Sequence, residues 1–218
     1  IFTFEVDATG TISETGTSIS TMLTYINKWP HIKWMLTVMN HGTASIFTAL
    51  RNNTDGAKDT FLTELVRIME KYPWCAGVDI DLERGGEIEN RDAANALFRD
   101  IYNAVKAYDS SKLVNICLPG MTSVNGSVGG ENWCVYGDLD QYCDTASIMS
   151  YGMAWSGSAP GPVSPRSWLE GIYDYATQVM NPDKVFLGMP AYGWNWQIYD
   201  TPENLGKYYR GTSHTYYA

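Results

Sequence analysis

The chain has 218 residues, which is enough to bury one sizeable hydrophobic core. Its 24 acidic and 15 basic side chains give a net charge of −9, and no basic cluster stands out, which argues against nucleic acid as a partner. No stretch approaches the ~20 consecutive apolar residues of a membrane span. The first residues show neither the basic segment nor the small-residue cleavage site of a signal peptide. A neutral or weakly charged substrate suits this composition best.

Predicted strands and helices alternate along the chain. Short apolar runs predict strands, and apolar residues repeated every three to four positions predict helices. In chain order these are strand 1–6, helix 18–28, strand 34–39, helix 57–71, strand 76–82, helix 90–107, strand 113–118, strand 146–151, helix 166–180 and strand 185–189. A loop rich in Gly and Asn runs from Gly120 to about Asn132. The alternation predicts an α/β fold with a parallel sheet and right-handed crossovers.

A (β/α)8 barrel and an open doubly wound sheet both fit this order of elements. The first strand is not followed by Gly-x-Gly-x-x-Gly, which disfavours a dinucleotide-binding sheet. The residues that look catalytic follow the carboxyl ends of strands, where a barrel places its active site. Six strands are predicted, and the length falls short of the ~250 residues of most barrels. We therefore expect one domain, 1–218, that is a barrel incomplete at both ends.

Three acidic residues share one face of the predicted strand at 76–82 and its end. Asp79, Asp81 and Glu83 alternate with Val, Ile and Leu. Side chains at alternate positions of a strand lie on the same face, so the acids point into the barrel and the aliphatic residues toward the helices. Burying several carboxyls together is costly and raises the pKa of at least one of them. A general acid, which must hold a proton near neutral pH, gives a reason for that cost.

A metal site is the alternative interpretation of these acids. Calcium loops separate their acids by polar residues and a glycine, whereas here the intervening residues are aliphatic. A magnesium-dependent barrel enzyme stays open as a second interpretation. The four cysteines and three histidines form no C-x-x-C pair or other zinc pattern. We expect isolated or buried thiols, with a disulfide between Cys134 and Cys143 as the alternative, and neither a metal nor a cofactor.

Aromatic residues gather near Gly and Pro in the second half of the chain. The sequence contains 8 Trp and 15 Tyr, including Trp155, Tyr192, Trp194 and Trp196. A flat aromatic face can stack on the C–H face of a sugar ring, although core filling explains any single residue equally well. The cluster at 192–196 favours a sugar platform.

The acidic strand closely resembles the D-x-x-D-x-D-x-E signature of glycoside hydrolase family 18, the chitinase and N-acetylglucosaminidase family. Three of the four acids match, and Ala76 stands at the first. The segment 149–152, Met-Ser-Tyr-Gly, resembles the family's M-x-Y-D without its Asp, and 188–193 matches G-x-P-x-Y-G in full. The segment 157–162 is similar to bacterial members that act on cell walls, including spore-cortex and phage-tail enzymes.

The resemblance implies a TIM barrel of which strands two to seven are visible, with Ile1–Val6 as strand two and 185–189 as strand seven. It implies retaining, substrate-assisted cleavage of β-1,4 bonds next to N-acetylglucosamine in peptidoglycan or chitin. Action would be extracellular or at the cell wall, with a phage virion as a further setting. The alternative is an inactive glycan-binding barrel, or a structural part of a phage tail or spore assembly.

The resemblance also implies roles for eight residues. Glu83 would be the proton donor, Asp81 would orient the substrate acetamide, and Asp79 would share a proton or hydrogen bond with Asp81. Tyr151 would donate a hydrogen bond to the acetamide carbonyl. The remaining substrate-binding candidates are Met149 and Tyr192, which would shape the subsite wall, and Trp155 and Trp194 as sugar platforms. The Gly at 152 leaves the identity of the substrate more open than the reaction type.

Overall fold

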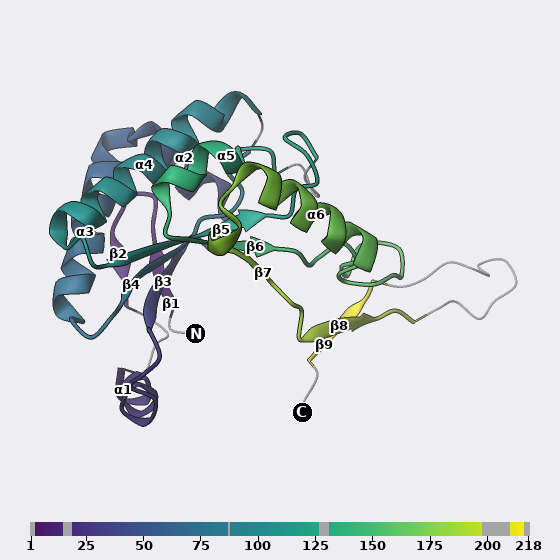
Figure 1. Ribbon diagram of the computed structural model, residues 1–218, viewed down its shortest axis with the longest axis horizontal. Helices are drawn as coiled ribbons and strands as arrows, with labels where there is room; N and C mark the ends of the chain where they lie inside the picture. The colour runs from purple at the N-terminus through teal and green to yellow at the C-terminus, as the bar shows by residue number, and fades with distance from the viewer. Residues whose placement is uncertain (1–2, 15–18, 87, 127–130, 198–209, 216–218) are drawn as a thin grey trace, which may run out of the picture.

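A seven-stranded, mostly parallel sheet forms the centre of the protein (Figure 1). The computed structural model describes residues 3–14, 19–86, 88–126, 131–197 and 210–215. The strand order is β2-β1-β3-β4-β5-β6-β7, and only β2, at one edge, runs antiparallel to its neighbour. The strands are β1 (Thr3–Val6), β2 (Ile12–Ser13), β3 (Met35–Met39), β4 (Gly77–Asp81), β5 (Leu113–Pro119), β6 (Thr145–Met149) and β7 (Val185–Leu187). All six predicted strands are confirmed, the first of them over its described residues.

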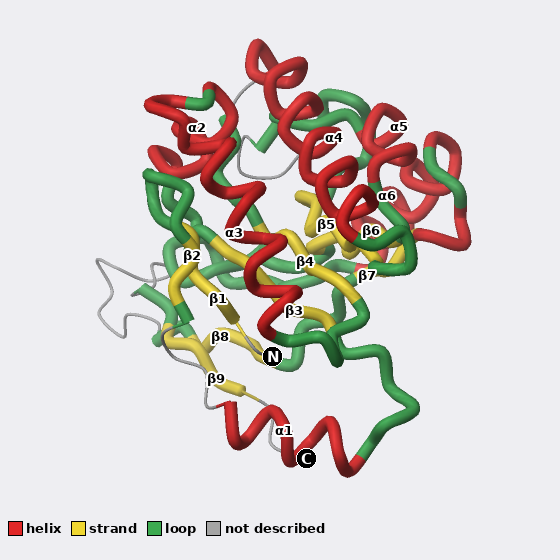
Figure 2. The backbone as a smooth tube through the Cα atoms, turned by 90° about the vertical axis from the view of Figure 1, so that its left-hand side faces the viewer, coloured by secondary structure: helices red, strands yellow, loops and turns green. Residues whose placement is uncertain are grey.

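Helices cover one side of this sheet, and Figures 1 and 2 show α2 to α6 together there while α1 lies apart. The four predicted helices are confirmed, and α2 and α5 are additions to the prediction. The helices are α1 (Ile19–Lys28), α2 (Ala44–Asn52), α3 (Ala57–Lys71), α4 (Arg91–Tyr108), α5 (Tyr136–Leu139) and α6 (Arg166–Val179). None of the helices in the described ranges is long and apolar enough to cross a membrane.

Several short elements were not predicted from the sequence. A two-stranded hairpin of β8 (Tyr192–Asn195) and β9 (Thr212–Thr215) extends beyond the main sheet. Within the described residues, four 3-10 turns join the larger elements, at Thr54–Gly56, Ile88–Asn90, Asp140–Tyr142 and Pro182–Lys184. These elements have three or four residues, which is too short for a periodic pattern to show.

The alternation in β4 sorts its side chains as predicted. Val78 and Ile80, with Leu82 just beyond the strand, are fully buried in the core beneath the helices. Burying each such aliphatic side chain contributes roughly 1.5–3 kcal/mol. Asp79 and Asp81 are only half-buried and lie on the opposite face. Hydrophobic burial on one face therefore fixes which way the carboxyls point.

The start of β4 depends on a glycine. A Cβ added to Gly77 would lie 1.9 Å from the carbonyl oxygen of Leu113 on β5. The two strands approach too closely there for any side chain, so Gly77 allows the pairing that begins the acidic strand.

Candidate active site

Asp79 lies deepest of the three acids, and neighbouring strands hold its carboxyl. Thr37 Oγ1 on β3 donates to Oδ2 at 2.8 Å, and Asn115 Nδ2 on β5 donates to Oδ1 at 2.6 Å. The three residues are direct partners in the β3–β4–β5 register. A third donor, Cys117 Sγ, lies 3.5 Å from Oδ1. Asp79 is thus a fixed, well-satisfied group, and its predicted hydrogen bond with Asp81 stays a prediction.

Asp81 is the acid with a free acceptor. Burial, followed by the nearby negative charges of Glu83 and Asp79, raises its pKa to about 6. Its Oδ1 is buried and has no hydrogen-bond partner among the described residues. An unpaired buried acceptor is costly, so this oxygen is suited to accept a hydrogen bond from a ligand.

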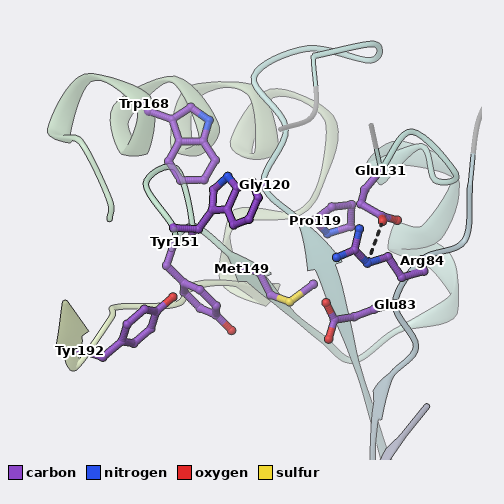
Figure 3. Close-up of a pocket in the computed structure, with 11 residues that line it drawn as sticks. Glu83, Arg84, Pro119, Gly120, Glu131, Met149, Tyr151, Trp168 and Tyr192 are labelled. Atoms are coloured by element: carbon purple, nitrogen blue, oxygen red, sulfur yellow. Dashed lines mark ion pairs between the residues drawn. The ribbon is translucent and has the colours of Figure 1, made fainter. Parts of the chain in front are cut away.

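Glu83 follows β4 and lines a pocket of about 630 Å³ at the carboxyl end of the sheet. Figure 3 shows the carboxyl of Glu83 facing the space between Met149 and the charged pair Arg84 and Glu131. The pocket is lined by Glu83, Arg84, Pro119, Gly120, Glu131, Met149, Tyr151, Gly152, Trp155, Trp168 and Tyr192. Five of the residues proposed from the sequence therefore line one pocket, namely Glu83, Met149, Tyr151, Trp155 and Tyr192. Asp79 and Asp81, on β4, are not among the lining residues.

One end of the pocket is aromatic. Tyr151 and Tyr192 meet edge to face with ring centroids 6.4 Å apart, and Figure 3 shows both on the side away from Arg84. Burial raises the pKa of Tyr151 to about 12, so its hydroxyl is a proton-bearing donor at neutral pH. Trp155 is 51% exposed, which leaves ring surface for stacking. This end combines stacking surface with a hydrogen-bond donor, as a sugar site requires.

The other end of the pocket is charged. Arg84 is the one cationic side chain among the described residues that line it, and its Nε lies 3.8 Å from Glu131 Oε1 (Figure 3). Burial raises the pKa of Glu131. Its Oε2 is buried and finds no partner within the described part of the chain. A donor-rich guanidinium and a free acceptor thus lie side by side next to Glu83.

Comparison with known proteins identifies the family. The model of Glycosyl hydrolases family 18 matches residues 1–217. The chain belongs to this family. The fold of this family is a TIM barrel, and the parallel sheet is part of such a barrel. Over the described residues the strands form an open sheet, in which β2 and β7 are the edges and do not pair with each other.

Individual relatives agree with this assignment. The Cortical fragment-lytic enzyme of Bacillus anthracis is 26% identical over 90% of this chain, which matches 45% of that protein. A solved chitinase structure from Chromobacterium violaceum superposes with a TM-score of 0.82 at 19% identity, over 99% of this chain and 64% of that one. The spore cortex-lytic enzyme SleL of Bacillus cereus superposes with a TM-score of 0.80 at 22% identity, over 98% and 48%. The chain thus spans less than half the length of the curated relative.

The pocket of this family-18 chain also contains residues that were not predicted, and three of them have large or charged side chains. Trp168, on α6, lines the pocket, whereas Trp194, on β8, is not among the lining residues. Trp194 instead packs edge to face on Tyr192 at 6.3 Å, and its sugar-binding role stays a prediction. Arg84 and Glu131 were also missed. Arg84 directly follows Glu83, and this adjacency was the one local signal available.

The cysteines and acids form no metal-binding cluster in the described part of the chain. Cys75, Cys117, Cys134 and Cys143 are free thiols, so the alternative Cys134–Cys143 disulfide is absent. No group of three His, Cys, Asp or Glu in the described ranges is arranged to hold an ion. The two carboxylate oxygens of Asp79 accept hydrogen bonds from Thr37 and Asn115.

Proposed function

We propose that this family-18 chain hydrolyses β-1,4 bonds next to N-acetylglucosamine by a retaining, substrate-assisted mechanism with Glu83 as proton donor. The observation that carries the proposal is the proximity of three groups. Glu83 and Tyr151 line one pocket, and Asp81, whose Oδ1 is unpaired, lies two residues before Glu83 and near enough to Tyr151 for its negative charge to raise the pKa of the tyrosine. Together they supply a proton, an acceptor for an amide N–H and a donor for an amide carbonyl.

The first step follows from these groups. The N–H of the substrate acetamide donates to Asp81, and Tyr151 donates to the acetamide oxygen. That oxygen attacks the anomeric carbon while Glu83 gives its proton to the glycosidic oxygen and the bond to the leaving sugar breaks. The product is a cyclic oxazolinium, whose positive charge the Asp81 carboxylate stabilises.

The second step reverses the roles. Glu83, now a carboxylate, takes a proton from water, and the water oxygen attacks the anomeric carbon. The bond between the acetamide oxygen and the anomeric carbon breaks, so the product keeps its original configuration. The hydrogen bonds of Asp79 to Thr37 and Asn115 tie β4 to the two neighbouring strands. These bonds help to fix the position of Asp81, which lies on the same strand.

The substrate class that fits best is peptidoglycan or chitin, acted on outside the cell or at the cell wall. The aromatic end of the pocket suits the apolar faces of the sugar rings, and the relatives' names, cortical fragment-lytic enzyme and chitinase, point to glycans of these two kinds.

Product analysis tests the proposal. Purified protein is incubated with peptidoglycan fragments and with chitin oligomers, and the products are identified by mass spectrometry and by NMR of the newly formed anomeric centre. We expect new reducing ends of N-acetylglucosamine that appear first as the β-anomer. Appearance of the α-anomer would sink the retaining mechanism. Binding without cleavage would favour the alternative of a glycan-binding barrel.

The Arg84–Glu131 pair predicts where the leaving sugar binds. In Figure 3 Glu83 lies on the same side of the pocket as this pair, with Met149 between it and the tyrosines. An acetamide-bearing sugar held by Tyr151 would therefore place its leaving sugar toward Arg84. Arg84→Ala and Glu131→Gln should each raise KM for chitin oligomers by about 10-fold, because each removes hydrogen bonds to that sugar. Both variants should cleave a nitrophenyl chitobioside normally, since its leaving group is not a sugar.

The two substrates form an internal control. Equal losses on the oligomer and on the nitrophenyl glycoside would show that the pair does not bind the leaving sugar. Trp155→Ala provides the opposite comparison, because loss of an aromatic platform on the acetamide side should weaken both substrates alike.

A further inference from the structure

Asn40 is a buried polar residue that directly follows β3, and its amide contacts the main chain of Glu83. Only 1% of the residue is exposed. Its Oδ1 accepts from the Glu83 N–H at 3.0 Å, and its Nδ2 donates to the Glu83 carbonyl oxygen at 2.9 Å. One side chain therefore holds both polar groups of the Glu83 backbone.

The remaining hydrogen-bonding capacity of Asn40 goes to the turn that leads into α2. Nδ2 also donates to the carbonyl oxygen of Thr43 at 3.1 Å, and Oδ1 also accepts from the N–H of Gly42 at 3.2 Å. A primary amide has two donor hydrogens and one oxygen with two acceptor sites. All four are used, so both the position and the orientation of the amide are fixed.

Glu83 needs such a contact because the sheet no longer holds it. The β3–β4 pairing ends with Met39 opposite Asp81, two residues before Glu83. The chain then turns sharply at Arg84, which adopts a left-handed φ of 64° that costs a non-glycine residue energy. At this point the hydrogen bonds from Asn40 take the place of the backbone hydrogen bonds between the strands. They thereby fix the direction in which the Glu83 side chain leaves the backbone.

We propose that Asn40 is a positioning residue, which sets the Glu83 carboxyl where it meets the glycosidic oxygen. The proposal rests on the proposed role of Glu83 as proton donor. Proton transfer depends steeply on geometry, and a displacement of ~1 Å can cost about 100-fold in rate. A contact that fixes the Glu83 main chain therefore acts on the chemical step more than on substrate binding, to which the aromatic and charged ends of the pocket contribute.

Asn40→Ala tests this role against a purely structural one. We expect kcat on chitin oligomers to fall about 10- to 100-fold, with KM changed less than about twofold. Amide hydrogen exchange, followed by mass spectrometry on a peptide that contains residues 82–86, should become faster at Glu83. The variant Asn40→Asp keeps the acceptor for Glu83 N–H and loses the donor to its carbonyl, so it provides a milder change should the Ala variant fold poorly.

Gly42→Ala is the matched control. Gly42 has a φ of 63°, so alanine strains the same turn, while the two bonds from Asn40 to Glu83 stay in place. We expect a lower melting temperature with kcat close to that of the wild type. The proposal is overturned if the Asn40 variants keep wild-type kcat, or if Gly42→Ala lowers kcat equally. A wild-type protein without activity would overturn the role of Glu83, and hydrogen exchange would still report whether Asn40 holds this segment.

Discussion

Glu83→Gln should lower kcat by about 10²- to 10⁴-fold on chitin oligomers and peptidoglycan fragments, because glutamine has no proton to give to the leaving oxygen. The amide has nearly the same shape as the carboxylic acid, so the pocket and substrate binding should persist. The measurement is the initial rate of reducing-end formation, compared with the KM or the Kd for the same oligomer. The loss should be smaller for a nitrophenyl glycoside, whose leaving group departs without full protonation.

Glu131→Gln is the matched control for that variant. It makes the same carboxyl-to-amide change in the same pocket, at a residue that we propose contacts the leaving sugar and not the scissile bond. It should change KM on oligomers and leave kcat near that of the wild type. A Glu83→Gln protein that hydrolyses oligomers at the wild-type rate would remove Glu83 from the mechanism. If the wild-type protein and Glu83→Gln were equally inactive on chitin, peptidoglycan and N-glycans, a binding or structural role for the barrel would be favoured instead.

Local patterns were sufficient to predict most of the fold. The period of two in β4 and the apolar stripes of α3, α4 and α6 arise from burial of one face, and this burial is visible in the sequence itself. Helix α2 was missed because its nine residues, with buried Phe47, Ala49 and Leu50, cover little more than two turns. The prediction of a single domain over 1–218 stays a prediction.

The residues of the site also differ in whether a local sequence pattern predicts them. Asp79, Asp81 and Glu83 could be predicted because they alternate within one strand. Asn40 lies 43 residues before Glu83, and no local pattern links the two, since their contact arises from strand pairing. Trp168 was predicted only as part of a helix, because its place over the pocket depends on how α6 packs against the sheet.

Two positions depart from the family's motifs, and the structure shows what surrounds them. Ala76 lies just before β4 with its backbone bonded to Trp34 and Leu113, at the end of the strand far from the pocket. Gly152 lines the pocket, and a Cβ added there would meet no atom within 4 Å. The missing Asp of the second motif therefore leaves open space in the pocket. In the proposed mechanism this space affects which sugar binds more than it affects proton transfer by Glu83.

The raised pKa of Asp81 makes stability depend on pH in an unusual direction. In the folded protein the pKa is about 6, against 3.8 for the unfolded chain, so the folded state binds the proton more tightly. The contribution of Asp81 is therefore most favourable below pH 4 and declines as pH rises to about 6, above which the loss is complete. The rise in pKa from 3.8 to about 6 corresponds to about 3 kcal/mol of unfolding free energy.

Asp81→Asn should remove this loss, because asparagine does not ionise. Relative to the wild type, the free energy of unfolding of the variant should rise by about 3 kcal/mol between pH 4 and pH 7. Urea unfolding of both proteins at a series of pH values measures the difference and cancels the titration of groups that do not interact with Asp81.

Glu14→Gln is a control of opposite sign. Lys71, Tyr72 and Arg67 lower the pKa of Glu14 to about 2, so its carboxylate stabilises the fold above pH 4.5 and loses that effect as pH falls toward 2. Relative to the wild type, Glu14→Gln should become less stable as pH rises, whereas Asp81→Asn becomes more stable. A difference between Asp81→Asn and wild type that does not vary with pH would mean that Asp81 ionises freely in the folded protein. The site would then lack the buried carboxyl with an unpaired oxygen on which the proposed acetamide contact depends.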